Sequence, residues 1–88
     1  MYFVYIIKNS YGKLYTGVTK NPTRRLATHN ARRGASFTKR SPTYKIVFLE
    51  DYKTLQDARK REVQIKKWRR EKKESLARRY HLGLSTKL

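Results

Sequence analysis

The 88-residue sequence has no cysteine, few acids and no long hydrophobic run. Without cysteine there are no disulfide bonds and no thiolate metal sites, which is compatible with a reducing cytoplasm. The apolar opening stretch, MYFVYII, is far shorter than the ~20 residues of a membrane-spanning helix and has no basic leader before it. We therefore expect a cytoplasmic protein that does not bind a membrane.

Positive charge dominates what is present. Lys and Arg number 23 against 6 Asp and Glu, which gives a formal net charge of +17. This charge exceeds what solubility requires, and its self-repulsion lowers the stability of the folded chain. Nucleic acid is the expected partner, because binding it relieves the repulsion and releases counterions. An anionic membrane surface or a ribosomal RNA scaffold is the alternative that charge alone leaves open.

Three strands are predicted. Residues 2–7, YFVYII, form a β-branched and aromatic run typical of a strand covered on both faces. Turn residues at 9–12 separate it from a second strand at 14–18, so the two should form a hairpin. A third strand is expected over 44–49.

Three helices are also predicted. The first runs over about 22–32, because Asn21 and the proline after it suit the N-cap and the first helical position. The second is capped by Thr54 and continues to about residue 70, with apolar residues at helical spacing. A weaker periodic pattern predicts the third over 71–79.

The order of elements is strand, strand, helix, strand, helix, helix. It indicates the α+β class, with an antiparallel sheet on which helices pack. We expect one domain over residues 1–80 and a frayed tail over 81–88. Its core must be modest, because a chain this short buries only about 60% of its unfolded surface. The loop at 33–43 has the composition of an exposed segment that follows phosphates.

Glu62 is an acid on the expected inner side of the second helix. At about 100° per residue it falls between Leu55 and Ile65, within the apolar arc. A charge buried there unpaired costs several kcal/mol, so it must be ion-paired, hydrated in a cleft or bound to a cation. Lys66 or Arg59 can supply an ion pair. One carboxylate with waters and a substrate phosphate also suits Mg²⁺, and both interpretations are open.

Two tyrosines fall on one face of the predicted hairpin. If a three-residue loop joins its strands, Tyr5 lies opposite Gly17 and Tyr15 lies diagonal to Tyr5. A loop of two or four residues would separate the tyrosines. Gly17 allows a ligand to approach closely, although core aromatics with hydroxyls at the rim explain the same pair.

The first predicted helix begins among cations, which the positive end of its dipole repels. Lys20, Arg24 and Arg25 therefore require an anion nearby, and a phosphate meets that requirement. Arg25 and His29 stand at i and i+4. A guanidinium that clamps phosphate and an imidazole that accepts a proton thus share one helix face. A solvated basic surface accounts for the same pattern.

Four stretches in this order resemble the GIY-YIG endonuclease superfamily: FVY at 3–5, YTG at 15–17, RRLATHN at 24–30 and REVQIKKW at 61–68. More narrowly, they are similar to a small stand-alone bacterial branch related to the N-terminal incision domain of nucleotide excision repair. The resemblance implies a three-stranded antiparallel sheet flanked by helices, with a catalytic surface on the sheet. It also implies one divalent ion, Mg²⁺ or Mn²⁺.

By this resemblance the catalytic residues are Tyr5, Tyr15, Arg25, His29 and Glu62, with Glu62 also the metal ligand. The implied reaction is in-line hydrolysis of a phosphodiester, in DNA rather than RNA. Either Tyr5 or His29 accepts the proton of the attacking water. The chain departs from the family in reading FVY for Gly-Ile-Tyr and YTG for Tyr-Ile-Gly. It also lacks an Asn after the glutamate, for which Lys66 or Lys72 is a candidate substitute.

A separate set of basic residues is expected to bind the nucleic-acid backbone: Lys13, Lys20, Arg24, Arg32, Arg33, Lys39, Arg40 and Lys66. A non-catalytic binding module on the same fold is the alternative function, with steep salt dependence and no need for metal. A structural protein bound to ribosomal RNA is a third. The sequence determines neither the structure of the substrate nor the oligomeric state.

Overall fold

A computed structural model describes residues 1–35 and 43–88, apart from the side chains of 32–35. The predicted order of elements and the α+β class are confirmed. The elements are β1 (Tyr2–Asn9), β2 (Leu14–Thr19), α1 (Pro22–Ala35), β3 (Tyr44–Tyr52), α2 (Leu55–Lys66) and α3 (Arg70–His81).

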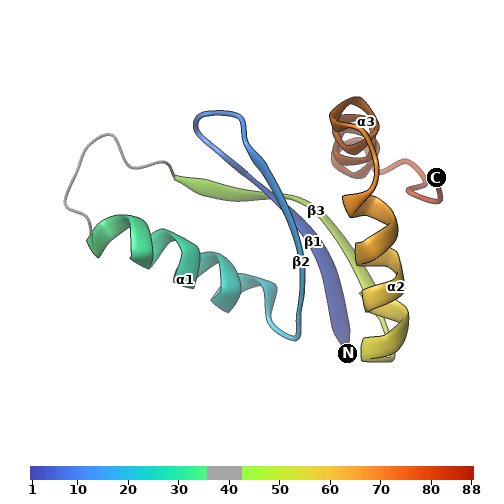
Figure 1. The fold of residues 1–88 in the computed structure, drawn as a ribbon, viewed down its shortest axis with the longest axis horizontal. Coiled ribbons are helices and arrows are strands. Elements are labelled where there is room, and N and C mark those ends of the chain that lie inside the picture. Colours follow the sequence, from blue (N-terminus) through green and yellow to red (C-terminus); the bar gives the residue numbers. More distant parts are fainter. Residues whose placement is uncertain (36–42) are drawn as a thin grey trace.

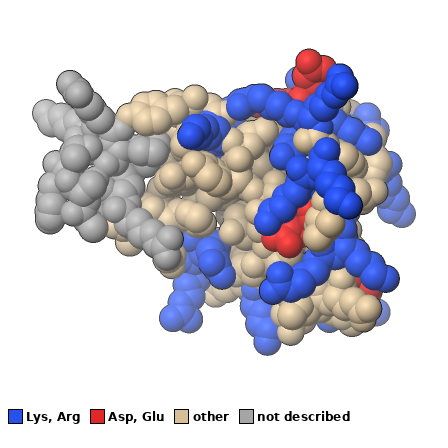
Figure 2. All heavy atoms as spheres, viewed as in Figure 1, with Lys and Arg blue, Asp and Glu red and all other residues tan. Residues whose placement is uncertain are grey.

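The three strands form one antiparallel sheet in the order β2-β1-β3. Figure 1 shows α1 on one side of this sheet and α2 and α3 on the other. The core lies between the sheet and α2 and α3, and its fully buried members are Val4, Ile6, Phe48, Ala58, Ile65 and Leu76. Lys and Arg side chains are spread over the outside of these two helices (Figure 2). No described helix is both long and apolar enough to cross a bilayer.

The hairpin of β1 and β2 has the three-residue loop, which was one of the loop lengths that the sequence left open. Asn9 Oδ1 accepts hydrogen bonds of 2.9 Å from the backbone N–H groups of Tyr11 and Lys13, which fixes the turn. Gly12 closes it at φ 87°, a conformation that glycine adopts without strain. The resulting register pairs Tyr5 with Gly17, as predicted.

The second helix is shorter than predicted, because it ends at Lys66 and not near residue 70. The N–H groups of Lys67 and Trp68 bond to the carbonyls of Gln64 and Ile65, three residues back, which tightens the last turn. Arg69 then adopts an extended conformation before α3 begins. Trp68 packs against the core at this bend.

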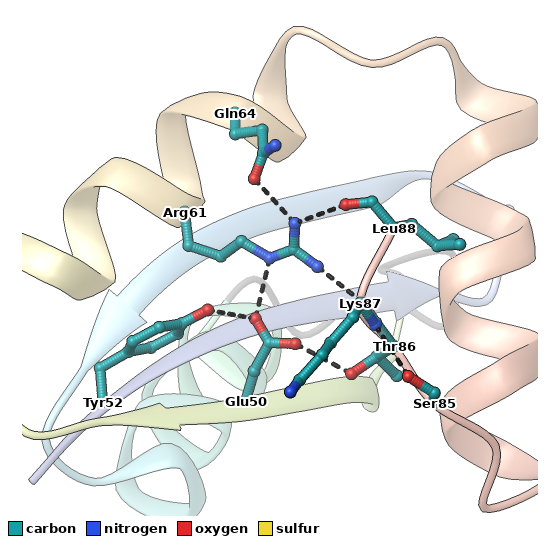
Figure 3. Close-up of polar contacts among 8 residues, drawn as sticks. All are labelled: Glu50, Tyr52, Arg61, Gln64, Ser85, Thr86, Lys87 and Leu88. Atoms are coloured by element: carbon teal, nitrogen blue, oxygen red, sulfur yellow. Dashed lines mark hydrogen bonds and ion pairs between the residues drawn. The ribbon is translucent and has the colours of Figure 1, made fainter.

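The third strand is longer than predicted and ends in a polar network (Figure 3). Glu50 accepts hydrogen bonds from Arg61 Nε at 2.8 Å, Tyr52 Oη at 2.5 Å and Thr86 Oγ1 at 2.9 Å. Arg61 also donates to the carbonyls of Thr86 and Leu88, at 2.7 and 3.1 Å. The C-terminal residues therefore fold back onto β3 and α2, which differs from the frayed tail that we expected.

Candidate functional site

Tyr5 lies at the centre of the candidate site, on the middle strand of the sheet. Its side chain is 7% exposed and lies over Gly17 of the neighbouring strand. A Cβ built at Gly17 would be 2.5 Å from Tyr5 Oη, so the glycine makes room for the phenol. The sequence suggested that a ligand could approach Gly17, whereas the structure fills this space with the Tyr5 side chain.

Two charges from different helices act on the Tyr5 hydroxyl. Burial raises the pKa of Tyr5 above its ordinary value, Arg25 on α1 lowers it, and Glu62 on α2 raises it. Burial is the largest of these effects, so the pKa is raised overall. The fold thus brings Tyr5, Arg25 and Glu62 into one electrostatic neighbourhood. It does not give Tyr5 the lowered pKa that a phenolate base needs at neutral pH.

Glu62 lies on the inner face of α2, as the helical wheel predicted, and is 9% exposed. Its Oε2 lies 3.3 Å from Lys66 Nζ, so the i, i+4 ion pair that the sequence allowed is formed. The Lys66 side chain is 54% exposed, and such a pair stabilises a helix by only a few tenths of a kcal/mol. The exposed lysine can move into solvent when another cation takes its place beside the buried carboxylate.

The described residues contain no cluster of three or more His, Cys, Asp or Glu side chains that could hold a metal ion. A cation at this site would therefore have one protein carboxylate, that of Glu62. Mg²⁺ accepts such a site, because it keeps several waters and binds substrate phosphates beside one or two carboxylates. The donor set fits one hydrated divalent ion and does not fit a two-metal centre.

Tyr15 and His29 are linked through a third ring, that of Tyr44. The Tyr44 centroid lies 5.8 Å from that of Tyr15, edge to face, and 5.4 Å from that of His29. Asn30 accepts from the Tyr44 N–H at 2.9 Å and donates to its carbonyl at 3.3 Å, which ties α1 to β3. These contacts hold Tyr15 and His29 on one surface. Tyr44 was missed because a tyrosine at the start of a strand carries no special signal.

A hollow of about 420 Å³ opens at the start of α1. The side chain of Asn21 caps the helix at 3.0 Å, as predicted, and the first turn contains no acid. The described residues lining the hollow include four cations and no acid; the cations are Lys20, Arg24, Arg25 and Arg59. A helix N-terminus and several cations around one hollow form an environment suited to a phosphate. The sequence suggested Arg59 only as an ion-pair partner of Glu62, because its place at this hollow depends on how α2 packs against the sheet.

The other predicted binding residues are placed in part. Lys13 and Lys66 are exposed at the surface, Lys13 beside α3 and Lys66 beside Glu62. Arg32 and Arg33 lie on α1, but their side chains are outside the described part of the chain. Lys39 and Arg40 also lie outside the described residues.

Comparisons with known proteins match most of this chain. The family model for the GIY-YIG catalytic domain matches residues 1–75. UPF0213 proteins of Staphylococcus aureus strains Mu3 and MW2 are each 44% identical over 72 residues, covering 82% of this chain and 88% of theirs. A UPF0213 protein from Bacillus halodurans with a solution NMR structure has a TM-score of 0.55 at 31% identity, over 86% of this chain and 82% of that one.

These matches define the domain as one of a nuclease class, with nucleic acid as its implied partner. The chain belongs to the GIY-YIG family.

Proposed function

We propose that the protein is a cytoplasmic, divalent-metal-dependent endonuclease that hydrolyses phosphodiester bonds in DNA. The supporting observation is that a guanidinium on α1 and a carboxylate on α2 both lie close enough to the buried phenol on β1 to act on its pKa. Packing does not explain the carboxylate near the tyrosine, because both polar groups lose favourable hydration when they are buried. DNA is preferred to RNA because the sequence resembles a DNA incision domain.

Arg25 binds the phosphate at the bond to be cut. It is exposed at the rim of the basic hollow, so a phosphate can reach it without displacing the core. Its guanidinium can donate two parallel hydrogen bonds to phosphate oxygens, and it offsets the charge that develops on them during displacement. The N-terminus of α1 adds partial positive charge at the same place.

Glu62 would hold the divalent ion, with Lys66 moving aside. When bound, Mg²⁺ or Mn²⁺ supplies charge that polarises the phosphate and stabilises the leaving oxygen. The burial of Glu62 against Ala58 and Ile65 fixes the carboxylate on the side of α2 that faces the sheet. The burial of Glu62 therefore fixes the position of its carboxylate charge relative to Tyr5.

Tyr5 orients the attacking water as a neutral phenol. Because burial raises its pKa, the hydroxyl keeps its proton at neutral pH and can both accept and donate a hydrogen bond. Of the two proton acceptors that the sequence left open, this favours His29, one helical turn from Arg25 on α1. Tyr44 and Tyr15 hold the His29 ring in place. The reaction is one in-line displacement, without a covalent intermediate.

The direct test incubates the purified chain with linear, flapped and branched DNA and with RNA, in Mg²⁺, in Mn²⁺ and in EDTA. We expect metal-dependent cleavage that falls by about 10²-fold or more in Glu62→Gln. Glu71→Gln is the matched control, because Glu71 is an exposed acid in the first turn of α3. Equal cleavage in EDTA or by Glu62→Gln would contradict the proposal. Binding without cleavage of any substrate would support the non-catalytic module.

A further inference from the structure

Basic hollows lie at both ends of the edge strand β2. The first, which we name the Lys20 groove, is the 420 Å³ hollow at the C-terminal end of β2. Its lining includes Val18 near the end of the strand and Lys20 just after it. The second, the Lys13 groove, has a volume of about 300 Å³. It is lined by Lys13, Leu14, Tyr15, Arg70 and Lys73.

Helix α2 runs beside β2 between these grooves. Its first residue, Leu55, and then Arg59 line the Lys20 groove. Beyond its far end, Arg70 donates a hydrogen bond to the carbonyl of Gly12, next to Lys13. The ion pair of Glu62 and Lys66 lies on the intervening part of the helix. Of the residues proposed for catalysis, Arg25 lines the Lys20 groove, Tyr15 lines the Lys13 groove, and Glu62 lies on the part of α2 between them.

The charges differ between the two grooves. The described lining of the Lys20 groove has no acid, and Lys20 itself lies 5.2 Å above the ring of Tyr2. Of the residues lining the Lys13 groove, Arg70 is paired with Glu74 at 3.0 Å. Glu74 also contacts Lys8 at 3.5 Å. None of the described ion pairs involves Lys13 or Lys73. Each groove thus has at least two cations available to a phosphate.

The separation of the grooves matches a stretch of nucleic-acid backbone. Lys13 and Lys20 flank β2 and are seven positions apart in the sequence. A strand rises about 3.3 Å per residue, so this separation is about 23 Å. A B-form duplex rises about 3.4 Å along its axis per base pair, so the same length spans about seven base pairs.

We propose that a DNA duplex lies along β2 and α2 with backbone phosphates in both grooves and the bond to be cut beside Arg25, in the Lys20 groove. This inference rests on the proposed function and adds to it the path of the substrate. It means that the protein needs DNA that reaches from the cut to the Lys13 groove, about seven base pairs away. The site would then select internal bonds and leave intact those that lie closer than this to the end of the DNA on that side.

Salt dependence of binding tests this path without requiring catalysis. Wild-type protein and three double variants are titrated in EDTA with fluorescent DNA duplexes of about 5 to about 16 base pairs, over a range of salt. Lys20→Ala/Arg59→Ala alters one groove and Lys13→Ala/Lys73→Ala the other. The control is Lys53→Ala/Lys60→Ala, because both lysines are exposed and Lys60 lines a separate hollow with Tyr52 and Asp57.

We expect the slope of log K against log salt to become shallower by about 1.8 in each groove variant on long duplexes, at about 0.9 per phosphate contact. The control should keep the wild-type slope. For wild type, the slope should stop steepening with length once the duplex exceeds about seven base pairs. Circular dichroism of each variant establishes that the exposed substitutions leave the fold intact.

The path is wrong if either groove variant has the slope of the control, if all three variants change equally, or if wild type does not bind DNA. Loss of cleavage is a separate result. A protein that shows the expected slopes but never cuts in Mg²⁺ or Mn²⁺ supports the path and contradicts the proposed activity. A protein that cuts DNA with metal, but whose Lys13 groove variant has the same slope as the control, supports the proposed activity and contradicts the path.

Discussion

The phenol of Tyr5 fills the space that a side chain at position 17 would need. A Cβ at Gly17 would lie 2.5 Å from Tyr5 Oη and 2.7 Å from Tyr5 Cζ, far inside van der Waals contact. Gly17 does not have a positive φ, so close approach and not backbone conformation requires the glycine. The second motif of the sequence therefore positions the tyrosine of the first.

Gly17→Ala should move Tyr5 and reduce both stability and cleavage. The added methyl group meets a buried ring, so we expect a loss of about 1–3 kcal/mol in the free energy of unfolding and at least a tenfold loss of cleavage. Urea denaturation and a cleavage assay measure the two effects. Tyr5→Phe is the comparison, because it keeps the ring and removes only the hydroxyl; it should lose cleavage with a smaller loss of stability. Wild-type cleavage by Gly17→Ala would contradict this arrangement.

Local patterns predicted the parts of the site that depend on one element or one turn. The turn after Asn9 set the hairpin register and hence the pairing of Tyr5 with Gly17. The helical wheel placed Glu62 inward. Arg59 at the basic hollow and the C-terminal residues on Arg61 were not predicted, because both depend on tertiary packing. Helical periodicity also cannot locate the bend at Trp68, since apolar spacing continues across it.

The pH dependence of cleavage distinguishes a phenol from a phenolate at Tyr5. Because burial raises the pKa of Tyr5, its hydroxyl stays protonated between pH 6 and pH 9. The ratio of wild-type to Tyr5→Phe cleavage rates should therefore be the same across this range. If the Tyr5 phenolate were the base, that ratio would grow about tenfold per pH unit. Single-turnover rates of both proteins at fixed salt provide the measurement.

Lys66 competes with a cation for the carboxylate of Glu62. Removing the lysine frees Oε2, which it approaches to 3.3 Å, so Lys66→Ala should reach half-maximal cleavage at a several-fold lower Mg²⁺ concentration. Because Glu62 is largely buried, loss of its partner should lower the free energy of unfolding by about 1–3 kcal/mol when no Mg²⁺ is present. Lys67→Ala is the matched control, since Lys67 is an exposed neighbour outside this pair. An unchanged Mg²⁺ requirement in Lys66→Ala would show that the ion does not bind at Glu62.

Tyr52 should make the fold sensitive to alkali without affecting cleavage. Burial, and then its hydrogen bond to Glu50, raise the pKa of Tyr52 well above the ordinary value of 10.0. A pKa raised by folding stabilises the protein fully below the unfolded value and stops doing so as pH rises through the folded value. The free energy of unfolding should therefore fall above about pH 10, and less steeply in Tyr52→Phe.

At neutral pH, Tyr52→Phe loses the hydrogen bond to Glu50, and we expect a cost of about 1 kcal/mol because the site is partly exposed. Its cleavage rate should match wild type, since Tyr52 belongs to the network with Glu50 and Arg61, whereas Tyr5 packs against Gly17. Urea denaturation at several pH values between 7 and 11 gives the stability of both proteins. If the free energy of unfolding fell equally steeply with alkaline pH in wild type and Tyr52→Phe, Tyr52 would ionise as freely in the folded chain as in the unfolded one. Its contact with Glu50 would then not hold the end of β3.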